Sequence, residues 1–184
     1  MTELSLNVLD IAQNCVKAKA TLIEISVNAN TEKDDLTIII KDNGYGMDEE
    51  TVRKVTDPFY TTRTTRRVGL GIPLYKMAAE MTGGSFDIKS ETGKGTTVTA
   101  RFVLSSIDRM PLGDMCGTME TLIVYNTHID FVYSYTVDDR SFSLSTVEMK
   151  NILGNIPLNA PQVVQYIRDY LKENTEAVNN KKYF

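Results

Sequence analysis

One strand of this chain ends in a way that an ordinary sheet does not require. The apolar run from Leu36 to Ile40 leads into KDNGYGM, residues 41 to 47, where an acid, an amide and two glycines follow. Glycine lets a backbone adopt left-handed conformations and lets other groups approach the main chain closely. The segment therefore predicts either a tight turn or a place where a ligand meets the backbone at Gly44 and Gly46.

Regular apolar patterns around this segment predict alternating helices and strands. Apolar residues at steps of four and three predict a first helix from Leu4 to Ala18, with a second, polar row along it. That row is Asn7, Asp10, Asn14 and Lys17. Alternation predicts strands near residues 23–29, 36–40, 86–88 and 98–102. A second helix is expected after Gly71, with an inward face formed by Leu70, Leu74, Met77 and Met81.

These elements predict an α/β sandwich. Strands that follow one another through short turns pair antiparallel, so we expect a mixed, mostly antiparallel sheet with helices on one face. The chain has 184 residues, of which 42% are hydrophobic and 24% charged, enough for one core and an appendage.

Charge and cysteine content exclude several classes of function. The net charge of −4 argues against binding to nucleic acid or to an anionic membrane surface, because both need a surplus of Lys and Arg. No apolar stretch approaches the length of a membrane span. Two cysteines outside any C-x-x-C pair predict neither a disulfide framework nor a zinc site. We therefore expect a cytoplasmic protein.

Five motifs follow one another across residues 4 to 104. They are DIAQNCVKA, DNGYGM, DPFYTT, GLGIPL and GKGTTVTARF. In this order they resemble the N box, first glycine box, F box, second glycine box and closing strand of the GHKL ATP-binding domain, or Bergerat fold. DNA gyrase, a heat-shock chaperone, sensor histidine kinases and mismatch-repair ATPases share that domain. The resemblance implies a histidine kinase-like ATP-binding domain over residues 1–104.

The resemblance also implies roles at the adenine end of an ATP site. Asp42 would accept a hydrogen bond from the exocyclic amine, and an ionised acceptor makes such a bond stronger. Thr96 would assist Asp42 through water, while Gly44, Gly46 and Met47 would belong to the same pocket. Taken alone, the glycines equally suit a turn with positive φ, and the threonine suits any strand.

At the phosphate end, the N box implies a magnesium site. Magnesium keeps several waters and needs only one or two protein oxygens beside phosphate oxygens, so the amide of Asn14 would suffice. Lys17 lies one helical turn further along and would reach a phosphate as a point charge. Without the resemblance, both residues equally suit a solvated helix surface.

The second glycine box and the loop before it would complete the site. Gly69, Leu70 and Gly71 precede a helix, whose free N–H groups and positive dipole end favour phosphate. The Thr-rich, Arg-rich segment from Thr56 to Val68 would form a lid, and Arg63 would contact the terminal phosphates. A basic loop of this kind is also typical of plain surface.

What the protein does with ATP is left open by the sequence. Asp10 lies four residues before Asn14, where hydrolases and serine-kinase members carry a glutamate as general base, yet the other boxes resemble the histidine kinase form. His128 is the only histidine and lacks the acidic neighbour of a phosphoacceptor site, so we expect no autophosphorylation in cis. The prediction is phosphotransfer or hydrolysis in trans on a protein partner. The alternative is an ATP-dependent switch or slow ATPase.

Residues 105–184 predict a smaller α+β unit. Apolar spacing indicates a helix near residues 115–123, a hairpin turning at Asp138 and Asp139, and a short helix that begins at the S-x-x-E capping box of Ser145 and ends at Gly154. A last helix would begin at Pro161, and residues 174–184 would form a frayed tail. We expect an accessory module that binds a protein partner.

Overall fold

The computed structural model describes residues 3–57 and 71–180. Over these residues the helices are α1 (Leu4–Lys17), α2 (Glu49–Val55), α3 (Gly71–Met81), α4 (Met115–Tyr125), α5 (Thr146–Leu153) and α6 (Pro161–Asn179). The strands are β1 (Leu22–Asn30), β2 (Asp35–Asp42), β3 (Ser85–Glu91), β4 (Gly95–Val103), β5 (Asp130–Val137) and β6 (Arg140–Ser145).

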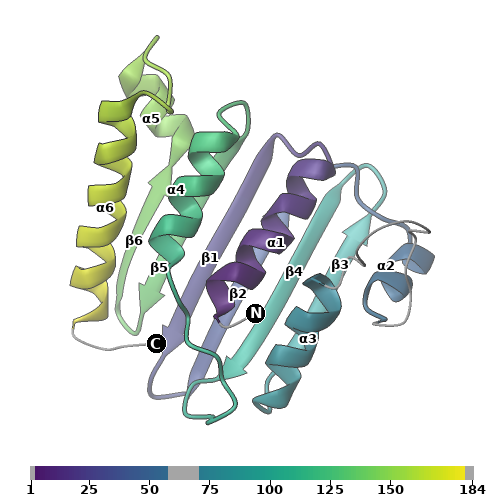
Figure 1. Ribbon diagram of the computed structural model, residues 1–184. Helices are drawn as coiled ribbons and strands as arrows, with labels where there is room; N and C mark the ends of the chain where they lie inside the picture. The colour runs from purple at the N-terminus through teal and green to yellow at the C-terminus, as the bar shows by residue number, and fades with distance from the viewer. Residues whose placement is uncertain (1–2, 58–70, 181–184) are drawn as a thin grey trace.

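The strands form one open, six-stranded sheet in the order β3-β4-β2-β1-β5-β6 (Figure 1). Four of the five neighbouring pairs are antiparallel, and β1 with β5 is the parallel pair. A parallel neighbour requires a crossover connection, which here contains α4. The predicted mixed, mostly antiparallel sheet is confirmed.

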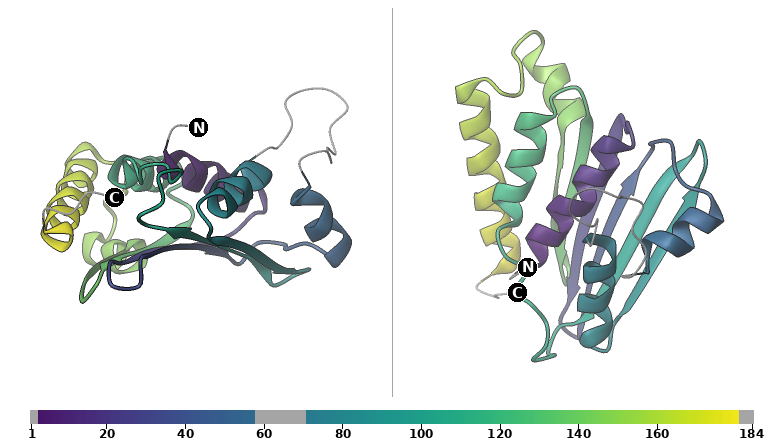
Figure 2. Two further views of the ribbon diagram at one scale, coloured as in Figure 1. Left: turned by 90° about the horizontal axis from the view of Figure 1, so that it is seen from below. Right: turned by 45° about the vertical axis from the view of Figure 1, so that its right-hand side comes forward.

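Helices cover one face of this sheet. Figure 2 shows α1, α3 and α4 over the same face, and α6 packs on β5, β6 and α4. The strand alternation explains the choice of face, because Ile23, Ile25 and Val27 are each at most 1% exposed while the residues next to them in β1 are partly or fully exposed. One core cluster runs beneath all of these helices and includes residues from Leu4 to Val178.

The C-terminal region adds strands to the same sheet. β5 aligns beside β1 from the pair Leu22 and Asp130 to the pair Ala29 and Val137, and β6 continues outward from β5. α4, the hairpin, the Ser145 cap and the end of α5 at Gly154 all lie where the sequence predicts them. The division at residue 104 into two units stays a prediction.

The expected frayed tail is wrong for residues 174–179, which continue α6. Val178 is 5% exposed and joins the core, and the hydroxyl of Tyr135 donates to Oδ1 of Asn179 at 2.7 Å. The hydrogen bond joins residues forty-four positions apart, which a local pattern does not reveal. Pro161 does open the helix, as predicted.

The inward face of α3 also differs from the prediction. Tyr75 and Ala79 are buried completely, whereas Met77 and Met81 are 51% and 59% exposed. The ring of Tyr75 packs against Phe86 and Phe102, with ring centroids 6.2 and 5.8 Å away. The aromatic ring therefore sets the rotation of the helix, and the methionine row lies outward.

The sequence analysis missed α2, which follows the glycine segment. Asp48 caps this helix by accepting a hydrogen bond from the backbone N–H of Thr51 at 2.7 Å. Acids in the first turn and bases in the last turn match the helix dipole. These capping and charge signals were present in the sequence, but the helix buries no residue, so no apolar stripe marks it.

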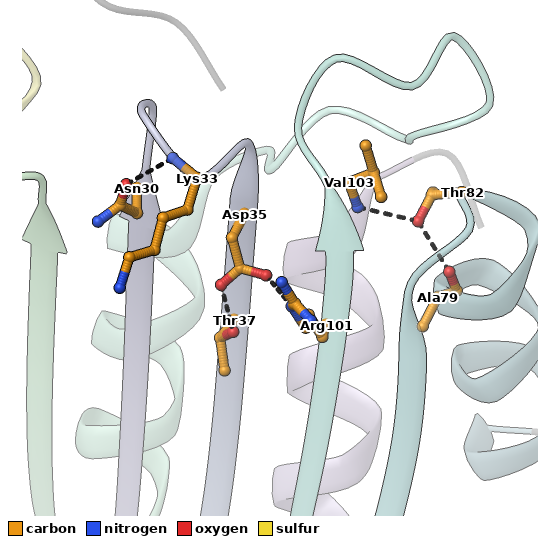
Figure 3. A network of polar contacts seen from close by, with 8 residues as sticks. All are labelled: Asn30, Lys33, Asp35, Thr37, Ala79, Thr82, Arg101 and Val103. Carbon is orange, nitrogen blue, oxygen red and sulfur yellow. Dashed lines mark hydrogen bonds and ion pairs between the residues drawn. The ribbon is translucent and has the colours of Figure 1, made fainter.

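Polar side chains tie together the sheet end that lies away from the glycine segment (Figure 3). Asp35 forms an ion pair with Arg101 on the neighbouring strand and accepts a hydrogen bond from the Thr37 hydroxyl at 2.8 Å. Beyond α3, the Thr82 hydroxyl accepts from the backbone N–H of Val103 at 3.1 Å.

No helix among residues 3–57 and 71–180 has the length and apolar character needed to cross a membrane.

Candidate functional site

The glycine segment after β2 is fixed to two neighbouring turns. Oδ1 of Asn43 accepts from the backbone N–H groups of Thr21 and Leu22, both at 2.9 Å. The N–H of Tyr45 donates to the carbonyl of Ala18 at 3.0 Å, and the carbonyl of Tyr45 accepts from Gly93 at 2.7 Å. Four hydrogen bonds thus join the segment to the protein's own backbone.

The two glycines of this segment are needed by the protein's own packing. A Cβ at Gly44 would lie 2.6 Å from the carbonyl oxygen of Ala18 in the turn after α1. Gly46 has a φ of +65°, and a Cβ there would lie 2.0 Å from the carbonyl oxygen of Glu91. Gly46 therefore fits the interpretation as a turn with positive φ, whereas Gly44 does not have a positive φ and is required by close packing alone. Contact of either glycine with a nucleotide remains a prediction.

Asp42 and Thr96 lie directly opposite each other on the antiparallel strands β2 and β4. Asp42 is 6% exposed, and its Oδ1 accepts from the backbone N–H of Gly44 at 2.8 Å. A buried carboxylate retains acceptor capacity beyond one such bond. The pair expected at an adenine ring is thus adjacent in the fold, although no periodic pattern connects the two residues.

Ser90 joins this pair to Met47, a link that the sequence analysis missed. Its oxygen accepts from the backbone N–H of Met47 at 2.8 Å, donates to the carbonyl of Gly95 at 3.0 Å and shares a 2.8 Å bond with Oγ1 of Thr96. A serine hydroxyl has one hydrogen. Because Ser90 donates this hydrogen to the carbonyl of Gly95, Thr96 must be the donor in the bond that the two hydroxyls share. The Thr96 oxygen then keeps lone pairs for water or a ligand.

The polar row of α1 divides into one buried and three more open residues. Asn7 is 1% exposed, and its Oδ1 has no hydrogen-bond partner. Asp10 and Asn14 are partly exposed and Lys17 is exposed. Their side chains form no hydrogen bond or ion pair with the residues that the structure describes. The row therefore offers a carboxylate, an amide and an ammonium group on successive turns.

α1 also contacts the start of α3. A Cβ on Gly71 would come 1.8 Å from Oδ2 of Asp10, so the carboxylate lies directly against the first residue of α3. Gly71 is buried. The start of α3 and the carboxylate thus border the same space. Arg63, Gly69 and Leu70, together with the rest of the predicted lid from residue 58 onward, lie outside the described residues.

The donors around Asn14 fit magnesium only with phosphate oxygens present. Among residues 3–57 and 71–180, no group of three or more His, Cys, Asp or Glu could hold a metal ion. The amide oxygen of Asn14 is available, which matches a cation that takes one protein ligand, phosphate and water.

Comparison with known proteins identifies the fold and the family. Over 102 residues the chain is 36% identical to the sensor protein SrrB of Staphylococcus aureus, covering 53% of this chain and 17% of that protein. The N-terminal domain of a DNA repair protein superposes with a TM-score of 0.53 at 17% identity, covering 79% of this chain and 53% of that chain. The Aquifex aeolicus MutL ATPase domain complexed with ADP superposes with a TM-score of 0.50 at 16% identity, covering 79% and 63%.

These likenesses extend over different parts of the chain. The two structural superpositions show the same fold, and their coverage continues past the first hundred residues into the C-terminal region. The family described as "Histidine kinase-, DNA gyrase B-, and HSP90-like ATPase" matches residues 2–106, more than half of the sequence. The chain therefore belongs to this ATPase family, the GHKL group, whose domain binds ATP.

Proposed function

We propose that this protein binds Mg-ATP along α1 and transfers or hydrolyses the γ-phosphate, acting in trans on a separate protein. One observation carries the proposal. α1 and its C-cap contact both glycine segments, because the C-cap residue Ala18 lies against Gly44 at one end and Asp10 of α1 lies against Gly71 further back. A single helix thus connects the expected adenine pocket to the expected phosphate site.

The proposal assigns adenine to Asp42 and the phosphates to the helix ends. The Asp42 carboxylate accepts a hydrogen bond from the exocyclic amine of adenine. The Thr96 oxygen, which keeps lone pairs for water or a ligand, assists Asp42 in this contact. Asn14 holds Mg2+ together with phosphate oxygens, and Lys17 contributes a positive charge. The first N–H groups of α3 then face the terminal phosphates, where the helix dipole favours negative charge.

Two chemical outcomes are compatible with this arrangement. Asp10 lies one turn before Asn14 and borders the start of α3, so its carboxylate is available to orient or deprotonate a water or hydroxyl. Transfer to a partner histidine would not require this base. Resemblance to the kinase boxes favours transfer, and the position of Asp10 favours slow hydrolysis or a switch as the second candidate.

The remaining parts of the proposal concern location and partner. Cys15 and Cys116 are both free thiols, which suits a reducing cytoplasm. Residues 105–184 supply the surface for a protein partner. The net charge of −4 disfavours nucleic acid.

Binding is tested with the Asp42→Asn variant. Isothermal titration should show ATP affinity reduced by at least about 1.5 kcal/mol, or roughly tenfold, since a hydrogen bond to a charged group is lost. Undiminished affinity in a folded variant would remove Asp42 from the adenine site.

Radiolabelled ATP, incubated with and without candidate partner proteins, then separates transfer from hydrolysis. Binding without either product would support the switch.

A further inference from the structure

Three polar residues form a row across one end of the sheet. Ser90 of β3 pairs with Thr96 of β4, and Thr96 pairs with Asp42 of β2, on three strands that are neighbours in the sheet (Figure 1). Asp42 lies two positions after Ile40, and Thr96 lies two positions before Val98, and both apolar residues are buried in the core. Because side chains on a strand alternate between the two faces, the row belongs to the face that the helices cover.

The Ser90 hydroxyl uses all of its hydrogen-bonding capacity within the protein. Its oxygen accepts from the backbone N–H of Met47 at 2.8 Å and donates to the carbonyl of Gly95 at 3.0 Å. A hydroxyl has one hydrogen and two lone pairs, so the second lone pair accepts the hydrogen of the Thr96 hydroxyl, with the two oxygens 2.8 Å apart. Since β3 and β2 lie on opposite sides of β4, the Thr96 hydrogen is directed away from Asp42.

Beside Asp42, Thr96 therefore offers only lone pairs. An ionised carboxylate is also an acceptor alone, so a ligand that reaches both groups must present donors. The exocyclic amine of adenine carries two N–H donors, whereas an exocyclic carbonyl at the same ring position has only lone pairs. The same selection acts through one water, because a water that donates to both Asp42 and Thr96 turns its own lone pairs toward the ligand.

We propose that Ser90 is a positioning residue that holds the Thr96 hydroxyl as an acceptor beside Asp42 and so favours purine nucleotides with an exocyclic amine over those with an exocyclic carbonyl. The inference rests on the proposed function, because it requires Asp42 and Thr96 to meet the base. Ser90 acts through Thr96 and need not touch the nucleotide. Once the Ser90 hydroxyl is removed, the Thr96 hydroxyl is able to rotate and donate to a carbonyl.

The test compares ATP with inosine triphosphate, which has a carbonyl in place of the exocyclic amine. Isothermal titration gives the ratio of the two affinities for wild type, Ser90→Ala and Ser90→Thr. Ser90→Ala should lower the preference for ATP about three- to tenfold, the usual effect of one hydrogen bond. Ser90→Thr keeps the hydroxyl on a residue that suits a strand, and should keep the wild-type ratio within about twofold. A purely structural role of Ser90 would weaken both nucleotides alike and leave the ratio unchanged.

A second pair of variants shows whether Ser90 acts through Thr96. Thr96→Val removes the hydroxyl that Ser90 is proposed to orient, so in this background Ser90→Ala should no longer change the ratio. Ser85→Ala is the matched control, because Ser85 is an exposed serine at the other end of β3, and it should keep the wild-type ratio. Circular dichroism and thermal unfolding check that each variant is folded. Ser90→Cys, which keeps a side chain of similar shape with a weaker donor, replaces Ser90→Ala if that variant is unfolded and should shift the ratio in the same direction.

The outcomes separate this role from the proposed function. An unchanged ratio in folded Ser90→Ala, or an equal change with and without the Thr96 hydroxyl, would overturn the role of Ser90 while ATP binding by the wild type stands. Absence of ATP binding by the wild type would overturn the proposed function itself.

Discussion

Oδ2 of Asp10 occupies the position that a side chain on Gly71 would take, since a Cβ there would lie 1.8 Å from this oxygen. The first residue of α3 is thus required to be glycine as long as the carboxylate keeps its place. Glycine is otherwise a poor choice inside a helix, where alanine is favoured by about 1 kcal/mol. This contact joins the second glycine box to Asp10, the residue proposed as a general base.

Gly71→Ala should therefore destabilise the protein by about 0.5 to 1.5 kcal/mol, because the Asp10 carboxylate, the end of a flexible side chain, must rotate away from the new Cβ. In an Asp10→Ala background the clash disappears, and the same substitution should become neutral or slightly stabilising because of the helix preference of alanine. Urea unfolding of wild type, Gly71→Ala, Asp10→Ala and the double variant measures the coupling free energy between the two positions. An identical effect of Gly71→Ala in both backgrounds would contradict the contact.

Asn14→Ala should remove the magnesium dependence of ATP binding, because the amide oxygen of Asn14 would be the protein ligand of the metal that accompanies the phosphates. ATP affinity is measured by titration with magnesium and with a chelator. Gln13→Ala, an exposed position next to Asn14 on α1, is the matched control and should keep the wild-type response. If added magnesium strengthens binding equally in Asn14→Ala, the metal is held elsewhere.

A fragment ending at residue 104 should lose its cooperative unfolding. Removing the later residues takes away β5, which pairs with β1 along its length, and it also removes Pro111 and Leu112, whose carbonyls accept from Leu4 and Ser5 at 2.9 and 2.8 Å. β1 would become an exposed edge, a form prone to aggregation. Size-exclusion chromatography and thermal unfolding test this against the full chain. A monomeric fragment with a sharp transition would show that residues 1–104 fold alone.

The observed fold shows which structural features local sequence patterns can predict. Strand alternation in β1 and β2 predicted the buried face correctly, because period-two burial is a property of each strand alone. The rotation of α3 was mistaken because the ring of Tyr75, with two aromatic partners on the sheet, outweighs the methionine row. The extension of α6 to Asn179 likewise depends on Tyr135, forty-four positions earlier. Such tertiary contacts override local propensity.

The candidate site was predictable in its boxes but not in its connections. The glycine segment and the N box were visible as motifs, and the structure brings Asp42 beside Thr96 through strand register. Ser90 escaped notice because a serine in a strand is an ordinary residue there. Its role arises from hydrogen bonds to Met47, Gly95 and Thr96, which only the folded chain creates.

Asp10→Asn distinguishes hydrolysis from phosphotransfer. The substitution keeps the shape of the side chain, so the contact with Gly71 and the Mg-ATP affinity should change little, within about threefold. If Asp10 is a general base, turnover should fall roughly 10²-fold, because positioned proton transfer typically contributes 10² to 10⁴. ATP hydrolysis and acid-labile phosphoprotein are both measured for wild type and variant.

The kinase alternative predicts a different result from the same variant. An acceptor imidazole on a partner protein is already nucleophilic near neutral pH and needs little help from a base. Phosphotransfer should then survive Asp10→Asn while any residual hydrolysis declines. Asp10→Glu provides a second comparison, since the longer carboxylate tests whether the short reach of aspartate limits hydrolysis. Loss of ATP binding in Asp10→Asn would contradict both roles and would leave Asp10 as a structural contact of α3.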